Sequence, residues 1–146
     1  MRARGILFAV VCAAAALASG SPASAYTYTF VNATKQPISQ LWMHTVSKFC
    51  HDVNWRGSVA SGGQVNVNSA SICLVDRIEV NGGRLRWSSS TGRFGGTFMI
   101  FPDGVCFFSS LEAAMSMIAG PGLNFIIPGL GTAAMLGLTK ASLRCS

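Results

Sequence analysis

Two histidines and five carboxylates are the residues of this chain that could support acid–base or hydrolytic chemistry. His51 is followed directly by Asp52, and a carboxylate beside an imidazole can orient that ring as a general base. Adjacent side chains rarely point the same way, however, and the neighbouring Cys50 is expected to be bound in a disulfide. His44 lies among apolar residues, as a structural histidine does. We therefore expect a non-enzymatic protein, with a small hydrolase that uses His51 as the alternative.

No other catalytic arrangement is evident. The sequence has no G-x-S-x-G, H-E-x-x-H, P-loop or dinucleotide-binding motif. A glycosidase needs two free carboxylates, but Asp103 lies in a predicted turn, Glu112 in a predicted helix start and Glu79 opposite an arginine. Asp52 and Asp76 remain, and nothing in the sequence places them together. We predict no catalytic residue and no cofactor.

The cysteines predict covalent cross-links. An even number of cysteines in a small exported chain is typical of disulfides, and four remain outside the N-terminal leader: Cys50, Cys73, Cys106 and Cys145. No C-x-x-C pair is present and neither histidine completes a zinc spacing, so no metal site is predicted. Three pairings are possible. Cys50–Cys73 and Cys106–Cys145 are favoured because each bridge then joins consecutive segments, and each would contribute about 3–4 kcal/mol.

The first residues predict export. Arg2 and Arg4 precede an uncharged apolar run at residues 6–18, and small residues follow as far as Ala23-Ser24-Ala25. This order is that of a cleavable signal peptide, and the apolar run is shorter than the roughly 20 residues of a membrane span. We expect residues 1–25 to be removed and the mature protein to be secreted or periplasmic. Without the two leader arginines, nine Lys and Arg face five Asp and Glu.

Residues 26–108 are expected to form a disulfide-stapled domain of β-strands. Aromatic and β-branched residues alternate from Tyr26 to Val31, as in a strand with one buried face. Further short alternating runs follow, separated by turn-forming residues such as those of Pro102-Asp103-Gly104. The pattern predicts about six or seven short strands in a compact antiparallel β-sandwich.

The pattern from Ile72 to Ser88 predicts a β-hairpin. Asn81-Gly82 stands between two alternating runs and is the usual signal for a two-residue type I′ turn. In that register Glu79 lies opposite Arg84. The apolar side chains share the core face: Ile72, Leu74, Ile78, Val80, Leu85 and Trp87. Asp76 falls on the same face, which requires a position near the sheet end, a pairing partner, or a bulge that shifts the phase.

Arginines and aromatic residues alternate on this hairpin and just after it. The candidate ligand-binding residues are Arg77, Arg84, Arg86, Trp87 and Arg93. Such residues could bind anionic lipid, a glycan or another cell-envelope surface, whereas export argues against nucleic acid. The alternative is a solvated face whose charges keep an edge strand soluble.

Residues 109–146 differ in character, with no charge from Ala113 to Thr139. Ser109 and Glu112 match a capping box, so a helix is expected to begin there, and a second short helix is expected within Thr132–Ser142. Three interpretations remain: a packed helical hairpin over one sheet, a membrane span, and a segment that contacts a membrane or partner conditionally. Two prolines and several glycines disfavour the span.

These observations favour a small exported binding protein that contacts an anionic surface through its basic hairpin. The alternative is a membrane-active secreted protein, toxin-like or antimicrobial, that uses the apolar segment 113–139. The two functions differ in which surface carries the activity: a folded hairpin in the first case, and a segment that leaves the fold in the second.

Overall fold

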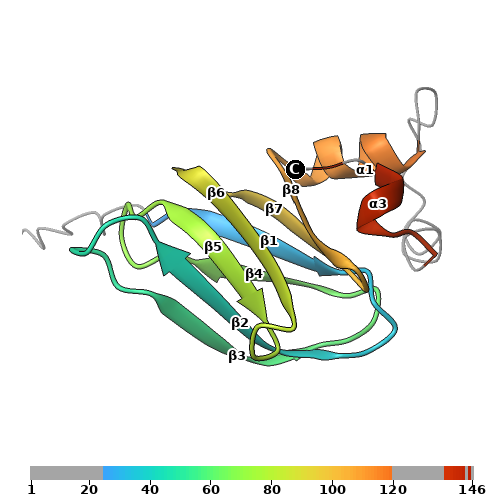
Figure 1. Cartoon of the computed structure of the whole chain (residues 1–146), viewed down its shortest axis with the longest axis horizontal. Coiled ribbons are helices and arrows are strands. Elements are labelled where there is room, and N and C mark those ends of the chain that lie inside the picture. The colour runs from blue at the N-terminus through green and yellow to red at the C-terminus, as the bar shows by residue number, and fades with distance from the viewer. Residues whose placement is uncertain (1–24, 120–136, 144, 146) are drawn as a thin grey trace, which may run out of the picture.

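The computed structural model describes residues 25–119, 137–143 and 145. Within them, eight strands form two four-stranded sheets that pack face to face, and two short helices lie near the C-terminal end (Figure 1). The predicted mainly β sandwich is therefore confirmed, with one or two strands more than expected. The expected signal peptide lies almost entirely outside the described residues.

Each sheet places two strands from the first half of the chain beside two strands from the second half. Sheet A has the order β4 (Gln64–Asn68), β1 (Thr27–Asn32), β7 (Gly96–Phe101) and β8 (Gly104–Phe108). Sheet B has the order β3 (Val53–Val59), β2 (Ile38–Thr45), β5 (Val75–Val80) and β6 (Leu85–Arg93). All pairs are antiparallel except β1 with β7, which is parallel and was not predicted.

Aromatic side chains fill the space between the sheets. Phe98 is fully buried, stacks on Phe30 at 5.3 Å and receives the edge of Trp87 at 4.9 Å between ring centroids. Trp87, one of the predicted ligand-binding residues, is 4% exposed and lies in the core between the sheets. Its position on the inward face of β6 follows from the alternation of the strand, which turns every second side chain to the core.

The β5–β6 hairpin has a longer turn than predicted. Val80 pairs with Leu85 and Glu79 with Arg86, so the turn comprises residues 81–84 and the register differs by two residues. A two-residue shift leaves every side chain on its predicted face, because the side-chain period of a strand is two. Asn81 has a positive φ of 46°, which asparagine tolerates better than most residues.

The start of β5 also differs from the prediction. Ile72 is 65% exposed, because the strand begins only at Val75, which is fully buried. A register shift between Val75 and Arg77 turns Asp76 away from the core, and its side chain is half-buried. Two of the three explanations for this carboxylate are met, because a bulge is present and Asp76 is the second residue of β5, near the end of the sheet.

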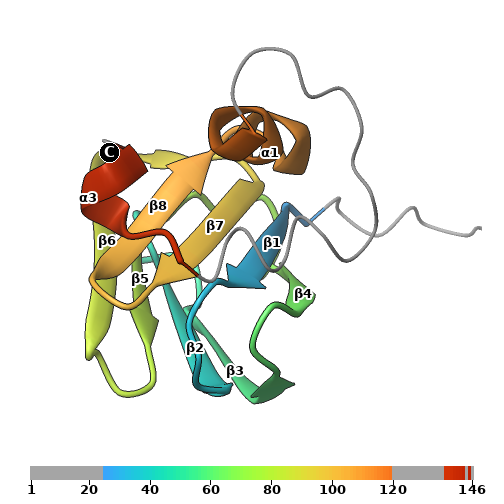
Figure 2. The ribbon, with the colours of Figure 1, turned by 90° about the vertical axis from the view of Figure 1, so that its right-hand side faces the viewer.

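The outer face of sheet A is also covered. Helices α1 (Leu111–Ala119) and α3 (Lys140–Leu143) lie over β7 and β8 (Figure 2), where a second apolar cluster includes Met99, Phe101 and Ala114. With both faces buried, β7 reads as a continuous apolar run rather than an alternating one.

The helix starts are fixed by side chains. The Ser110 hydroxyl accepts the Ala113 N–H at 3.0 Å, so α1 is capped one residue later than the predicted Ser109. The Asp103 carboxylate accepts the N–H groups of Lys140 at 2.6 Å and Ala141 at 3.1 Å. Although desolvation acts to raise the pKa of Asp103, these backbone N–H groups outweigh it and hold that pKa below its ordinary value.

Much of the apolar segment 113–139 lies outside the described residues, which omit 120–136. Its use as a membrane-entering segment therefore stays a prediction, as does the expected second helix before Lys140. In the part of the chain that is described, no helix is long and apolar enough to cross a membrane. The ends of the segment that are described pack on sheet A.

Both favoured disulfides are present. Cys50 and Cys73 join the β2–β3 and β4–β5 loops with Cα atoms 5.8 Å apart, and Cys106 and Cys145 join β8 to the C-terminal segment with Cα atoms 5.6 Å apart. Each bridge links two segments that are also packed together, so neither requires the fold to distort.

Candidate functional site

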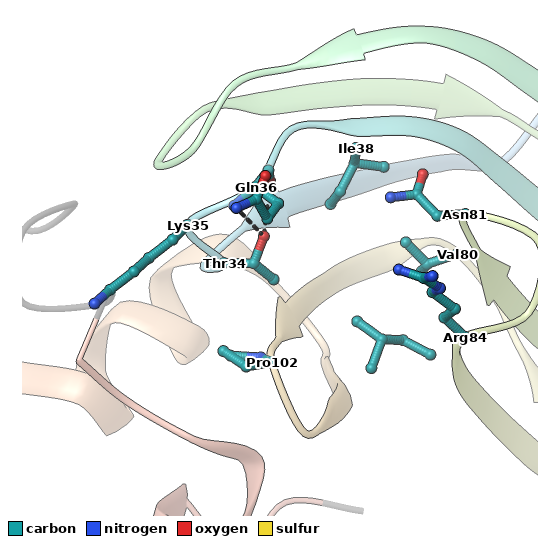
Figure 3. A pocket seen from close by; sticks show the side chains of 9 residues that line it. Thr34, Lys35, Gln36, Ile38, Val80, Asn81, Arg84 and Pro102 are labelled. Atoms are coloured by element: carbon teal, nitrogen blue, oxygen red, sulfur yellow. Dashed lines mark hydrogen bonds between the residues drawn. The ribbon is translucent and has the colours of Figure 1, made fainter.

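Successive strands run in alternating directions, so their connections gather at the two ends of the sandwich. The β1–β2, β5–β6 and β7–β8 turns meet at one of these ends and enclose a cleft of about 500 Å³ (Figure 3). The lining residues are Thr34, Lys35, Gln36, Ile38, Val80, Asn81, Arg84, Leu85 and Pro102. We call this end of the molecule the cleft end. A cavity of this size is within the range of small-molecule sites.

The cleft combines an apolar lining with positive charge. Its apolar side chains are Ile38, Val80, Leu85 and Pro102. Arg84 lies on the wall opposite Thr34 and Pro102, while Lys35 leaves the rim with its ammonium group directed away from the centre (Figure 3). No carboxylate is among the lining residues, and neither cation forms a hydrogen bond or ion pair with any residue that the structure describes. An anion would therefore meet an unneutralised guanidinium.

The buried amide of Asn32 fixes the wall formed by the β1–β2 turn. Its Nδ2 donates to the carbonyl oxygens of Gln36 at 2.8 Å and Val59 at 2.9 Å. Its Oδ1 accepts the N–H of Thr34 at 3.0 Å and the Thr34 hydroxyl at 2.7 Å. Asn32-Ala33-Thr34 has the spacing of a glycosylation motif, but in the folded protein the amide is 0% exposed. Its role is structural.

A second asparagine fixes the wall formed by the β5–β6 turn. Asn81 Oδ1 accepts the N–H groups of Ser39 at 2.9 Å and Gln40 at 3.2 Å, and the Asn81 N–H donates to the Gln40 carbonyl at 3.0 Å. The turn that carries Arg84 is therefore tied to the start of β2. Because both walls are held by internal hydrogen bonds, a ligand would not have to order them on binding.

The structure does not bring the five predicted ligand-binding residues together. Arg77 and Arg86 lie on the outer face of sheet B, 51% and 66% exposed, each with Nε 3.9 Å from Glu79 Oε1. Arg84 lines the cleft. Arg93 ends β6 and lies over the Phe107 ring at 5.3 Å from its centroid. Glu79 thus offsets part of the charge of the sheet B arginines, whereas Arg84 has no ion-pair partner within residues 25–119, 137–143 and 145.

The histidine that Asp52 orients is His44 and not His51. His44 Nδ1 donates to Asp52 Oδ2 at 2.8 Å, and Asp52 Oδ1 accepts the Thr45 N–H at 3.0 Å. Trp42 stacks on the imidazole at 4.7 Å. The remaining nitrogen, Nε2, is buried, has no hydrogen-bond partner in the described part of the chain, and lies 3.8 Å from Glu79 Oε1.

This arrangement lacks the parts of a hydrolytic site. A general base needs a hydroxyl, thiol or water within hydrogen-bonding reach, but His44 Nε2 is shielded from solvent and has no such partner in the described chain. His51 is exposed, and Asp52 is already engaged by His44. No group of three or more His, Cys, Asp or Glu suited to a metal ion is found in the described segments. The pair instead closes the β2–β3 loop.

The sequence pointed to Arg84 but not to the rest of the cleft. Lys35, Gln36 and Pro102 belong to two other turns, and in sequence they read only as connections between strands. A signal was present in the run Thr34-Lys35-Gln36-Pro37, a cation in a turn next to a strand, although such turns are common. Comparison of the chain with protein-family models, with curated proteins and with solved structures found no match.

Proposed function

We propose that this protein is an exported, non-enzymatic binding module that takes a small organic anion with an apolar body into the cleft. The observation that carries the proposal is the Arg84 guanidinium beside the apolar side chains of Ile38, Val80 and Leu85. Among the residues that the structure describes, this guanidinium has no ion-pair partner and no carboxylate lines the cavity. Carboxylates, sulfonates and phosphate esters that carry a short alkyl or aromatic group form the ligand class.

The two parts of such a ligand would interact with different parts of the cleft. A planar guanidinium can donate two parallel hydrogen bonds to a carboxylate or phosphate, which a lysine cannot. The apolar body would displace water from Ile38, Val80, Leu85 and Pro102, at about 25 cal/mol for each Å² of apolar surface removed from water. Neither part alone would give useful affinity at an exposed site, but together they select an amphipathic anion.

Export is supported by the covalent chemistry. Two disulfides persist in an oxidising compartment and are rare in the cytosol. The N-terminal charged, apolar and small-residue pattern points the same way.

Calorimetry with a matched pair of ligands tests the proposal. Octanoate and octanamide share the chain and differ in charge, so octanoate should bind more tightly to the purified protein. The Arg84→Gln variant should weaken octanoate binding by about 1–2 kcal/mol, or about five- to thirtyfold in Kd, and leave octanamide unchanged. Lys48→Gln removes the same net charge at the far end of the sandwich and is the control.

Amide chemical shifts show where octanoate binds. Octanoate should shift the resonances of residues 34–38 and 80–85 and leave those of the β2–β3 loop in place. Equal affinity of octanoate for the parent and Arg84→Gln proteins would refute the assignment of the anion to this cleft. Equal losses for Arg84→Gln and Lys48→Gln would show that only the overall charge of the protein matters.

A further inference from the structure

The end of the sandwich opposite the cleft carries exposed apolar side chains on three separate loops. Phe49 is 84% exposed, Phe94 69%, Ile72 65% and Val46 50%. They belong to the β2–β3, β6–β7 and β4–β5 loops, which lie at the same end because Thr45, Val75 and Arg93 are paired neighbours at the strand ends. We call this end, which contains Cys50–Cys73, the disulfide end. Clustered apolar exposure of this kind marks an interaction surface.

Covalent and hydrogen bonds hold these loops in place. The Cys50–Cys73 disulfide joins the residue after Phe49 to the residue after Ile72, with Cα atoms 5.8 Å apart. The Val46 N–H donates to the Leu74 carbonyl at 3.1 Å. Because the exposed side chains are presented on a fixed frame, contact with a partner would not need to order the loops first.

Phe94, on the β6–β7 loop, is also held by its neighbours. Phe94 meets Tyr26 edge to face at 5.3 Å, a contact that holds the base of its loop without burying the Phe94 ring. The Tyr26 N–H in turn donates to the Ser69 hydroxyl at 3.1 Å. The β6–β7 loop is thereby linked to the β4–β5 loop, so the three loops form one continuous surface.

The charge nearest the exposed Phe49 ring is positive. Lys48 Nζ lies 5.3 Å from the centroid of that ring, whereas the Arg93 guanidinium lies over the Phe107 ring. Two carboxylates also lie at this end, but that of Asp52 is engaged by His44 and Thr45, and Asp76 is half-buried in the β5 bulge. A surface that combines exposed Phe and Ile with Lys complements the headgroup region of an anionic bilayer.

We infer that the disulfide end docks onto an anionic lipid bilayer, with Phe49 and Ile72 entering the interface and Lys48 contacting lipid phosphates. The apolar side chains project from three loop tips rather than lining a groove, and a fluid interface can accept separate projections without a matching shape. This surface is distinct from the cleft, and it does not involve the apolar segment 113–139.

Vesicle sedimentation tests the inference. The purified protein should bind phosphatidylcholine vesicles that contain about 30% phosphatidylglycerol, and binding should weaken at least fivefold on pure phosphatidylcholine. The double variant Phe49→Ser/Ile72→Ser should reduce binding to the anionic vesicles at least tenfold. Met117→Ser is the matched control, since Met117 is 55% exposed on α1, away from this end, and its loss should change binding less than twofold.

Three outcomes would overturn the inference. One is an absence of binding to anionic vesicles. Another is equal binding by the parent and the double variant, which would direct attention to the C-terminal segment. The third is a concentration-dependent dimer in light scattering that the double variant abolishes, because the surface would then belong to a second copy of this chain. An unchanged circular dichroism spectrum verifies that the double variant is folded.

Discussion

Replacing Asn32 with alanine should destabilise the protein more than any other single asparagine change in β1 or β4. The amide is fully buried and makes four hydrogen bonds that join β1 to the β1–β2 turn and to the end of β3. Its removal leaves the buried carbonyl of Val59 and the part-buried N–H of Thr34 without these partners. The Gln36 carbonyl, 2.8 Å from the Thr34 hydroxyl oxygen, can then accept the proton that this hydroxyl gave to Asn32.

The size of the effect follows from these two groups. Each buried polar group that loses its partner costs about 1–3 kcal/mol, so Asn32→Ala should lower the free energy of unfolding by about 2–6 kcal/mol. A domain of this size has a total stability of about 5–15 kcal/mol, so the loss should be plain in a denaturation curve. Asn32→Asp should be no better, because a carboxylate would face two carbonyl oxygens where the amide donates.

Urea unfolding followed by tryptophan fluorescence, with the disulfides intact, measures the change. Asn66→Ala is the matched control, since Asn66 lies on the exposed side of β4, where its Oδ1 accepts the Thr29 hydroxyl at 2.9 Å. That variant should lose less than about 1 kcal/mol. If Asn32→Ala and Asn66→Ala were equally stable, the buried amide would not be what holds the cleft wall.

Two further predictions concern ionisation. The lowered pKa of Asp103 means that its hold on α3 is complete above about pH 4 and is lost as the pH falls through its folded-state pKa. The protection of the Lys140 and Ala141 amides, measured as the exchange rate relative to the intrinsic rate at each pH, should therefore fall at acid pH in the parent and stay constant in Asp103→Asn. Burial raises the pKa of Tyr28, whose hydroxyl donates to the Arg93 carbonyl at 2.7 Å, so stability should fall above about pH 10. Tyr28→Phe should lose about 1 kcal/mol at neutral pH and show a smaller alkaline decline in urea midpoint.

The parts of the fold that could be predicted are those encoded by neighbouring residues. Alternation from Tyr26 to Val31 and the turn at Pro102-Asp103-Gly104 are local patterns, and the disulfide pairing followed from the order of the cysteines. The predicted length of the hairpin turn was wrong by two residues, because the turn depends on Asn81, whose side chain binds the backbone of β2. That contact spans more than forty residues of sequence and has no local signature.

The candidate site was less accessible to prediction for the same reason. Arg84 was predicted from its charge, but the other residues that line the cleft around it come largely from the β1–β2 and β7–β8 turns. Trp87 was grouped with the arginines because it is their neighbour in sequence, yet alternation along β6 places it in the core. The hydrogen bond of Asp52 with His44 rather than His51 likewise depends on how the β2–β3 loop folds back.

The two proposed surfaces lie at opposite ends of the strands, and this separation follows from the chain path. Because the chain reverses direction at each connection, the turns before β2, β6 and β8 fall at the cleft end, and the loops before β3, β5 and β7 fall at the disulfide end. A bilayer in contact with Phe49 would therefore leave Arg84 in solvent. Docking and ligand binding would then not compete. Because the sandwich core separates the two surfaces, substitutions at one end should leave binding at the other end unchanged.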